Sequence, residues 1–225
     1  MTDLYNSPED LPAALPVFPL RGAILLPRAS LTLNVFEPRY LALVDYALAN
    51  ERLMGVVQPA GNAESAESPK GKSFPVRPVG CLGRITAFNE TDGGPVIISL
   101  TGISRFSVGD EVDSDAPFRL FATDFRLYAD DFIRDLGEEE VDRVRLLATL
   151  RRYLEANGLN ADWERINEAA NEQLVNTLSI LSPYGPEEKQ ALLEAGSLKE
   201  RAEALVALAE MELAARNDSS GTSLQ

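Results

Sequence analysis

Two short apolar runs bounded by prolines, followed at once by a proline-initiated helix, constrain the fold of this chain most. The runs cover residues 15–20 and 31–36, and their length predicts β-strands. Pro38 suits the first position of a helix, because its fixed φ matches helical backbone and its missing N–H needs no partner there. Glu37 would lie beside the positive end of that helix. We therefore predict a strand-to-helix corner with a helix that ends at Asn50.

Beyond this corner, the front of the chain has the pattern of short strands and the back has the pattern of helices. Alternating residues predict a strand over 79–88, and a reversal signal before Pro95 predicts its partner strand over 95–100. Two more strands are predicted over 103–108 and 118–128. The back begins with an apolar stripe at helical spacing, formed by Val141, Val144, Leu147, Leu150 and Leu154. These patterns predict an α+β chain in four parts: a flexible leader over 1–13, a β-barrel over 14–130, a helical bundle over 131–216 and a disordered tail over 217–225.

The chain of 225 residues contains no histidine and a single cysteine, Cys81. Histidine supplies most general bases near neutral pH and is the commonest metal ligand. Its absence excludes Ser-His-Asp and Cys-His catalysis within one chain, as well as Cys/His zinc sites. One cysteine excludes an internal disulfide, and the mid-strand position of Cys81 predicts a packed thiol. We therefore expect no catalytic residue, no metal and no cofactor.

The net charge is −14, from 35 acidic and 21 basic residues. Phosphate backbones bind clustered lysine and arginine, so this charge argues against a nucleic-acid partner. No apolar run approaches the roughly 18 residues of a membrane span, and the acidic amino terminus lacks the pattern of a secretory signal. We therefore expect no membrane partner and a cytoplasmic location. The sequence leaves the oligomeric state open.

Gly71, Lys72 and Ser73 invite comparison with a phosphate-binding loop. The Walker pattern also requires an earlier glycine, where this chain has Ala66, and a preceding strand. Residues 60–75 have the composition of a polar loop and no strand pattern. We therefore expect no nucleotide-binding site.

Separated motifs in one consistent order resemble the Lon amino-terminal domain family, whose members precede the ATPase and protease parts of Lon proteases. The opening strand and turn correspond to residues 18–27, and the most recognisable motif is Val35-Phe36-Glu37-Pro38-Arg39-Tyr40. The family's middle strands correspond to residues 55–57 and 79–85, and its G-x-x-R-F strand to Gly102-Ile103-Ser104-Arg105-Phe106. Residues 181–190 resemble the last helical linker of the longer bacterial members. One departure is Arg28, because many members have a glycine after the proline.

This resemblance implies a stand-alone bacterial form without the ATPase and protease domains, with a PUA-like β-barrel, an inserted helix and a carboxy-terminal helical bundle. Lon proteases cleave peptides with a Ser-Lys pair in a separate domain, and the four lysines here lie in no run that resembles it: Lys70, Lys72, Lys189 and Lys199. The resemblance therefore implies a non-catalytic module that binds unfolded or partly exposed polypeptide segments, in protein quality control or as an adaptor. A protease or a chaperone is a further candidate partner.

Recognition of a polypeptide could use an open strand edge and shallow apolar pockets. The candidate contact residues are Leu25 and Leu26 in the first turn and Phe74 in the long loop. The corner itself has two interpretations. In the structural one, Glu37 caps the helix and Arg39 fixes a neighbouring strand; in the other, the corner binds a partner.

Two alternative functions remain open. The helical half could dock a partner or pair with itself, which would make the protein a scaffold or a self-associating interaction protein. A hydrolase that uses two carboxylates in a cleft is the other alternative, although no two acids stand out by an apolar setting that would separate their pKa values.

Overall fold

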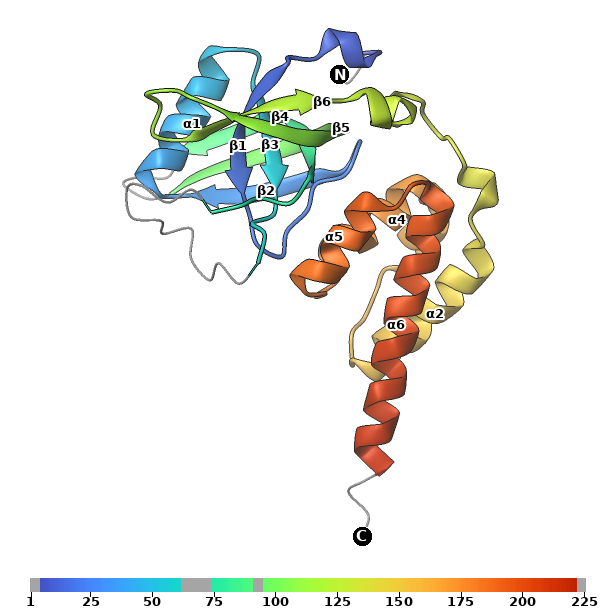
Figure 1. Cartoon of the computed structure of the whole chain (residues 1–225). Helices are drawn as coiled ribbons and strands as arrows, with labels where there is room; N and C mark the ends of the chain where they lie inside the picture. Colours follow the sequence, from blue (N-terminus) through green and yellow to red (C-terminus); the bar gives the residue numbers. More distant parts are fainter. Residues whose placement is uncertain (1–4, 62–73, 91–94, 222–225) are drawn as a thin grey trace. The chain divides into compact units, whose positions relative to one another are not determined.

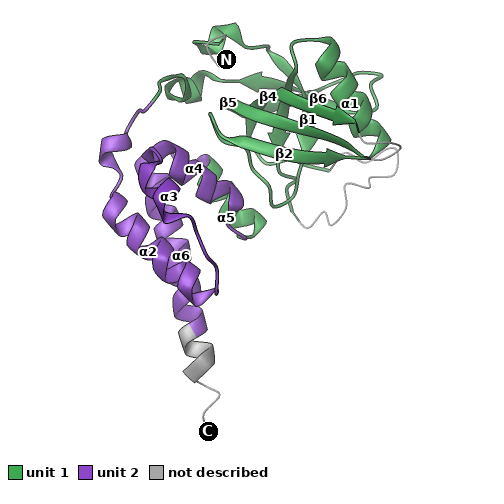
Figure 2. Ribbon diagram, turned by 180° about the vertical axis from the view of Figure 1, so that it is seen from behind, with its two compact units in different colours: residues 1–134, 184–193 green, residues 135–183, 194–225 purple. Residues whose placement is uncertain are grey.

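The computed structural model describes residues 5–61, 74–90 and 95–221, with side chains up to residue 216. The polar loop fragment 71–73 therefore lies outside the described residues. The chain divides into two compact units, drawn in different colours in Figure 2. Unit 1 contains residues 1–134 and 184–193, and unit 2 contains residues 135–183 and 194–225. Within the described parts, every helix is too short or too polar to cross a bilayer.

Unit 1 combines a six-stranded sheet with helices, so the chain is α+β as predicted (Figure 1). Helix α1 begins at Pro38, directly after Glu37, which confirms the predicted corner. In chain order the elements are η1 (Pro8–Asp10), β1 (Ala14–Pro19), β2 (Ser30–Val35), α1 (Pro38–Ala49), β3 (Leu53–Val57), β4 (Val79–Glu90), β5 (Val96–Val112), β6 (Arg119–Asp124), η2 (Arg126–Phe132) and α5 (Pro186–Glu194).

The strands pair in the order β2-β5-β4-β3-β1-β6. Strands β1 and β3 run parallel, and the other neighbours run antiparallel. The 17 residues of β5 allow it to pair with β2, β4 and β6. Because β5 pairs with β6, strands β5, β4, β3, β1 and β6 follow one another in a cycle. Strand β2 pairs with β5 alone and is therefore an edge strand of the described sheet.

The core of unit 1 surrounds Phe106 of β5, whose side chain is fully buried. Apolar side chains from several strands share this core: Leu15, Val17, Leu53, Val57, Leu82, Ile103, Phe121 and Phe125. Gly55 and Gly80 leave room for the ring, because a Cβ at either position would lie 2.8 Å from Phe106 Cζ. Cys81 is buried in the same sheet, as its position in the sequence predicts.

The segment before β1 differs from the flexible leader expected over residues 1–13. Thr123 of β6 donates hydrogen bonds of 2.9 Å from its backbone N–H to Ala13 O and from its hydroxyl to Pro12 O. Tyr5 and Leu11 pack against the core of unit 1. Residues 5–13 are therefore held to the sheet by apolar contacts that their acidic neighbours conceal in the sequence.

Helix α5 also differs from the expected arrangement, because most of it belongs to unit 1 and not to a bundle over 131–216. Gln58 Nε2 donates to Pro186 O at 2.9 Å and to Gln190 Oε1 at 3.1 Å. Gln190 Nε2 donates to Val79 O at 3.1 Å. Both glutamines are buried, so each bond satisfies an amide that would be costly to leave unpaired. Buried amides therefore fasten α5 to Gln58, which directly follows β3, and to Val79 at the start of β4.

Unit 2 is helical, and α2 and α4 pack against α6. Its elements are η3 (Glu138–Glu140), α2 (Arg143–Ala156), α3 (Trp163–Glu168), α4 (Asn171–Leu181) and α6 (Leu198–Gly221). Arg201 of α6 is buried and donates to Asn176 Oδ1 of α4 at 3.1 Å. Helix α6 extends to Gly221, past the expected start of a disordered tail at residue 217.

The buried face of α2 is rotated from the predicted stripe. Val144 is 82% exposed, whereas Leu146, Thr149 and Tyr153 are buried. Arg145 and Arg152, on the same helix, both form ion pairs with Glu210 of α6. The helical period was therefore predicted correctly, but not the side that faces α6.

Candidate functional site

The corner of residues 36–40 exposes one large apolar side chain and ties down the polar ones. Phe36 is 70% exposed. Glu37 is the N-cap residue of α1, but its side chain makes no capping hydrogen bond. Instead, Glu37 Oε2 accepts from Arg39 Nε at 3.1 Å and from Arg39 Nη2 at 2.7 Å. Glu37 was expected to cap the helix and Arg39 to fix a neighbouring strand. Instead, the two side chains form an ion pair with each other.

Tyr40 anchors the corner to the sheet. Its ring stacks on Phe18 of β1 with 4.3 Å between the centroids, and the Arg39 guanidinium lies 4.6 Å from the Tyr40 centroid. The Tyr40 hydroxyl is buried and has no hydrogen-bond partner among the described residues. Burial raises the pKa of Tyr40 above its ordinary value, so the hydroxyl stays protonated at neutral pH. With Tyr40 held inside, Phe36 is left at the surface.

Phe74, a candidate contact residue, is held half-buried beside Arg119 at the start of β6. Arg119 Nη1 donates to Phe74 O at 2.8 Å, and the guanidinium lies 5.1 Å from the Phe74 centroid. Arg119 Nε and Nη2 each donate to the Glu111 carboxylate at 2.7 Å. The Phe74 ring therefore has a defined place and remains partly open to a partner.

Leu25 and Leu26 are placed differently from the expectation that they contact a peptide. Both side chains are 0% exposed. Leu25 Cδ2 approaches Gly83 so closely that a Cβ there would lie at 2.6 Å. The turn therefore inserts both leucines into the core of unit 1, and the structure removes them from the candidate contact surface.

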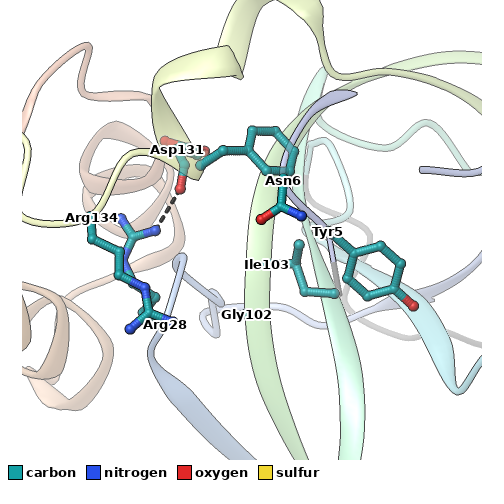
Figure 3. A pocket seen from close by; sticks show the side chains of 8 residues that line it. Tyr5, Asn6, Arg28, Gly102, Ile103, Asp131 and Arg134 are labelled. Carbon is teal, nitrogen blue, oxygen red and sulfur yellow. Dashed lines mark hydrogen bonds between the residues drawn. The ribbon is translucent and has the colours of Figure 1, made fainter. Parts of the chain in front are cut away.

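Arg28 follows these leucines and adopts a left-handed backbone with φ of 61°. Glycine accepts that conformation without strain, which explains why the resemblance predicts a glycine at this position. In this chain Arg28 adopts the same conformation. Arg28 N donates to Gly102 O at 2.9 Å, and Arg28 Nη1 donates to Asp131 O at 2.5 Å (Figure 3). The adjoining cavity of about 50 Å³ is lined by Tyr5, Asn6, Arg28, Gly102, Ile103, Asp131, Phe132 and Arg134.

A buried ion pair between Arg105 and Asp131 organises the same side of unit 1. Arg105 Nη2 donates to Asp131 Oδ1 at 2.7 Å, Nε reaches both carboxylate oxygens, and the Arg105 backbone N–H donates to Oδ2 at 2.8 Å. Arg105 Nη1 donates to Leu193 O of α5 at 3.3 Å, and the guanidinium lies 4.8 Å from the Tyr128 ring. Burial alone would lower the pKa of Arg105, but the Asp131 hydrogen bonds and charge outweigh it and raise that pKa.

Sequence reasoning identified Arg105 through its motif and missed its partners. Asp131 lies 26 residues further along, in a segment without a recognisable motif. The roles of Gln58 and Gln190 were missed as well, although Gln190 lies within residues 181–190, which resemble the family's last helical linker. Their signal in the sequence is weak. Gln58 is a polar residue directly after an apolar strand, and Gln190 is a polar residue within the short helix α5.

Lys189 of α5 is 2% exposed, and burial lowers its pKa to about 8. The unfolded chain, in which lysine keeps its ordinary pKa of 10.5, then binds more protons between about pH 8 and pH 10.5. We therefore expect the free energy of unfolding to rise from pH 8 to pH 9.5, by at most about 1.4 kcal/mol per pH unit. Urea unfolding at half-unit pH intervals measures this slope.

The matched variants for this experiment are Lys189→Met and Lys199→Met, because Lys199 is exposed on α6. Lys189→Met should flatten the rise, and Lys199→Met should leave it unchanged. A slope that survives Lys189→Met would assign the proton release to another group. The series stops at pH 9.5 because the raised pKa values of Tyr5, Tyr40 and Tyr153 act in the opposite direction at higher pH.

The described residues contain no group of three or more histidine, cysteine or carboxylate side chains placed to hold a metal ion. Asp131 is a buried carboxylate, but its oxygens are occupied by Arg105. Elsewhere on the described surface of unit 1, Phe36 is an exposed apolar side chain and β2 is an edge strand.

A family model for the substrate-binding domain of the ATP-dependent protease La (LON) matches residues 14–210. A Lon protease of Flavobacterium johnsoniae is 27% identical over 207 residues, and Lon protease 2 of Thermus thermophilus is 23% identical over 209 residues. The alignments cover 86% and 91% of this chain, but 23% and 25% of the relatives. The chain therefore spans about a quarter of the length of these curated relatives.

Two solved structures share the fold. The N-terminal domain of a Mycobacterium avium complex Lon protease has a TM-score of 0.63 at 17% identity, covering 88% of this chain and 98% of that one. A Lon N-terminal domain protein from Xanthomonas campestris has a TM-score of 0.57 at 22% identity, covering 86% and 97%. Both similarities extend over nearly the whole of each solved domain.

Proposed function

The chain belongs to the LON substrate-binding domain family, and we propose from this membership that it binds unfolded or partly exposed segments of other polypeptides without cleaving them. The match over residues 14–210 is the observation that carries the proposal. We place this activity in cytoplasmic protein quality control, with the protein presenting segments to a protease or chaperone as an adaptor.

Within this proposal, the strand cycle of unit 1 is a PUA-like barrel. The support is the pairing of β5 with β6, which joins both ends of the order β5-β4-β3-β1-β6. Such a barrel gives a rigid frame on which loops and edges can contact a flexible partner. The described surface of unit 1 supplies large exposed apolar side chains for this contact: Phe36, Tyr46, Phe88, Val112, Leu127 and Ile133.

Calorimetry against a reduced, unfolded model protein tests the proposal. We expect saturable but weak binding, because a surface that accepts many different sequences makes few contacts that are optimised for any one of them. Incubation of the same protein with the chain, with and without ATP, should yield no fragments. The absence of both heat and competition with a labelled unfolded chain would contradict the proposal.

A substitution at Phe36 provides a residue-level test. Phe36→Ser should lower the affinity for the unfolded protein about five- to tenfold, because an exposed ring is removed from the contact surface. Its melting temperature should match that of the parent chain, since the ring packs little in the free protein. Leu181→Ser is the control, because Leu181 is 75% exposed at the end of α4 in unit 2, outside the proposed contact surface. Equal losses in both variants would point to general apolar attraction.

Self-association through unit 2 is a second candidate function. Val144 is 82% exposed on α2 and Met211 is 68% exposed on α6, so unit 2 also presents apolar side chains to solvent. Size-exclusion chromatography over a hundredfold concentration range distinguishes the two. A dimer that disappears in Val144→Glu would favour this candidate.

A further inference from the structure

We propose that β2 is the docking edge for an extended segment of an unfolded polypeptide, which adds to the sheet as a further antiparallel or parallel strand. This inference rests on the proposed function, since it names the place and the chemistry of polypeptide binding. Strand β2 pairs with β5 on one side only. Among the described residues, β5 is the one strand that pairs with β2, and the side chains from Ser30 to Asn34 are exposed or half-buried.

The edge of β2 lacks the features by which monomeric proteins prevent strand addition. Natural edge strands carry charged residues, prolines or bulges that block pairing with another chain. Strand β2 has the sequence Ser-Leu-Thr-Leu-Asn-Val, without a charge, proline or glycine, in a chain with 25% charged residues. Its six residues pair with β5 without a register shift. An uninterrupted, uncharged strand of this kind is a template for another strand.

The end of β4 shows the contrast within the same sheet. Beyond Arg84, β4 pairs with β5 but no longer with β3. A register shift between Ile85 and Ala87 interrupts that pairing, and the strand ends at the charged Glu90. Bulges and charges are protective features of an edge. The sheet therefore protects one of these edges and leaves the β2 edge open.

The two faces of β2 define the side chains of the occupant. Leu31 and Leu33 are half-buried and lie opposite Leu100 and Ile98 of β5, which are fully buried. These leucines therefore form the rim of the core. On the other face, Thr32 lies beside Ser99 with 3.4 Å between their hydroxyl oxygens. An added strand with apolar residues on the leucine face and small polar residues on the hydroxyl face matches both.

Charge decides between a foreign segment and a second copy of this chain. Each copy carries a net charge of −14, so two copies repel each other at long range. An uncharged segment flanked by basic residues meets no such repulsion. The occupant is therefore a β-prone, alternating stretch of neutral or basic character, of the kind that aggregates when unfolded.

The probe is a fluorescein-labelled octapeptide of alternating valine and threonine with a lysine at each end, titrated into the full chain. We expect saturable binding and slower amide hydrogen exchange in residues 30–35. The same peptide with every internal amide nitrogen methylated keeps its side chains and loses the strand hydrogen bonds. It should bind at least about tenfold more weakly, because several backbone hydrogen bonds are lost.

Asn34→Lys and Asn89→Lys form a matched pair of variants. Both asparagines are exposed and both lie opposite Ile97, but Asn34 is on the edge strand and Asn89 is on β4, across β5. Asn34→Lys should weaken peptide binding at least about tenfold, since an edge lysine blocks strand addition. Asn89→Lys should leave binding unchanged, and both variants should retain the parent melting temperature.

Each other outcome overturns the inference in a distinguishable way. Equal binding of the methylated peptide, or exchange protection outside residues 30–35, would exclude β2 as the docking edge. Either result would leave the proposed function intact. Binding of the reduced, unfolded model protein without binding of the octapeptide has the same meaning. Failure of both ligands overturns the proposed function as well. Concentration-dependent dimers with protected β2 amides in the absence of peptide would make a second copy the occupant.

Discussion

Asp131→Asn lowers the free energy of unfolding of unit 1 by about 3–5 kcal/mol, because it leaves the Arg105 guanidinium buried without a counter-charge. The side chains of Arg105 and Asp131 are 7% and 8% exposed, so solvent compensates poorly for the lost partner. Far-UV circular dichroism in urea measures the change. Tryptophan fluorescence reports unit 2 separately, since Trp163 of α3 is the single tryptophan.

Two further variants separate the cost of an unpaired charge from the value of the pair. Asp124→Asn removes an exposed ion pair with Arg126 and should cause no measurable change in unfolding. The double variant Arg105→Met with Asp131→Leu should recover most of the stability, because it leaves no buried charge. A double variant as unstable as Asp131→Asn would show that the hydrogen bonds to Leu193 O and the Arg105 backbone dominate.

Gly102→Ala should destabilise unit 1 by about 3 kcal/mol, through a clash that the backbone cannot avoid. A Cβ at this position would lie 2.0 Å from Leu26 O and 2.7 Å from Leu26 C. The approach is fixed from both directions, because Gly102 N donates to Ala29 O and Gly102 O accepts from Arg28 N, each at 2.9 Å. The turn at 25–29 would have to leave the sheet to admit the methyl group.

Gly109→Ala is the control for this clash, since Gly109 lies in the same strand. Its Cβ would meet Ala122 O at 3.1 Å, a contact that small shifts relieve. Urea unfolding should place Gly109→Ala close to the parent and Gly102→Ala far below it. Similar losses in both variants would mean that strand conformation, and not the contact with Leu26, determines the effect.

These two predictions assign physical roles to three positions of the G-x-x-R-F motif. Gly102 admits the turn that carries Leu26, Arg105 binds Asp131, and Phe106 fills the core. The motif could be read from the sequence because its residues are contiguous. Its partners could not, because Asp131 and the turn are brought to the strand only by the tertiary fold.

The strand-to-helix corner was predictable for a similar reason. Proline geometry and local apolar spacing determine where α1 begins, and both depend only on residues close together in the sequence. The exposure of Phe36 was not predictable, because it depends on Tyr40 packing against Phe18 of another strand. The burial of Leu25 and Leu26 likewise depends on room that Gly83 and Gly102 leave on β4 and β5.

In unit 2, apolar periodicity predicted the presence of a helix but not which of its sides is buried. It predicted α2 but assigned Val144 to the buried side, where Thr149 and Tyr153 lie instead. Apolar spacing gives a period, and the rotation of a helix is determined by its neighbours. Here Glu210 of α6 pairs with Arg145 and Arg152, which are charged residues that an apolar stripe ignores.

The place of α5 in unit 1 affects how the protein emerges from the ribosome. The sheet is complete in sequence by residue 134, but its last helical segment ends at residue 193. At about 5–20 residues per second, translation of the intervening 59 residues takes roughly 3–12 s. During that interval Gln58 and the amino end of β4 lack their α5 partners, so the sheet reaches its final hydrogen bonding only after α5 has been made.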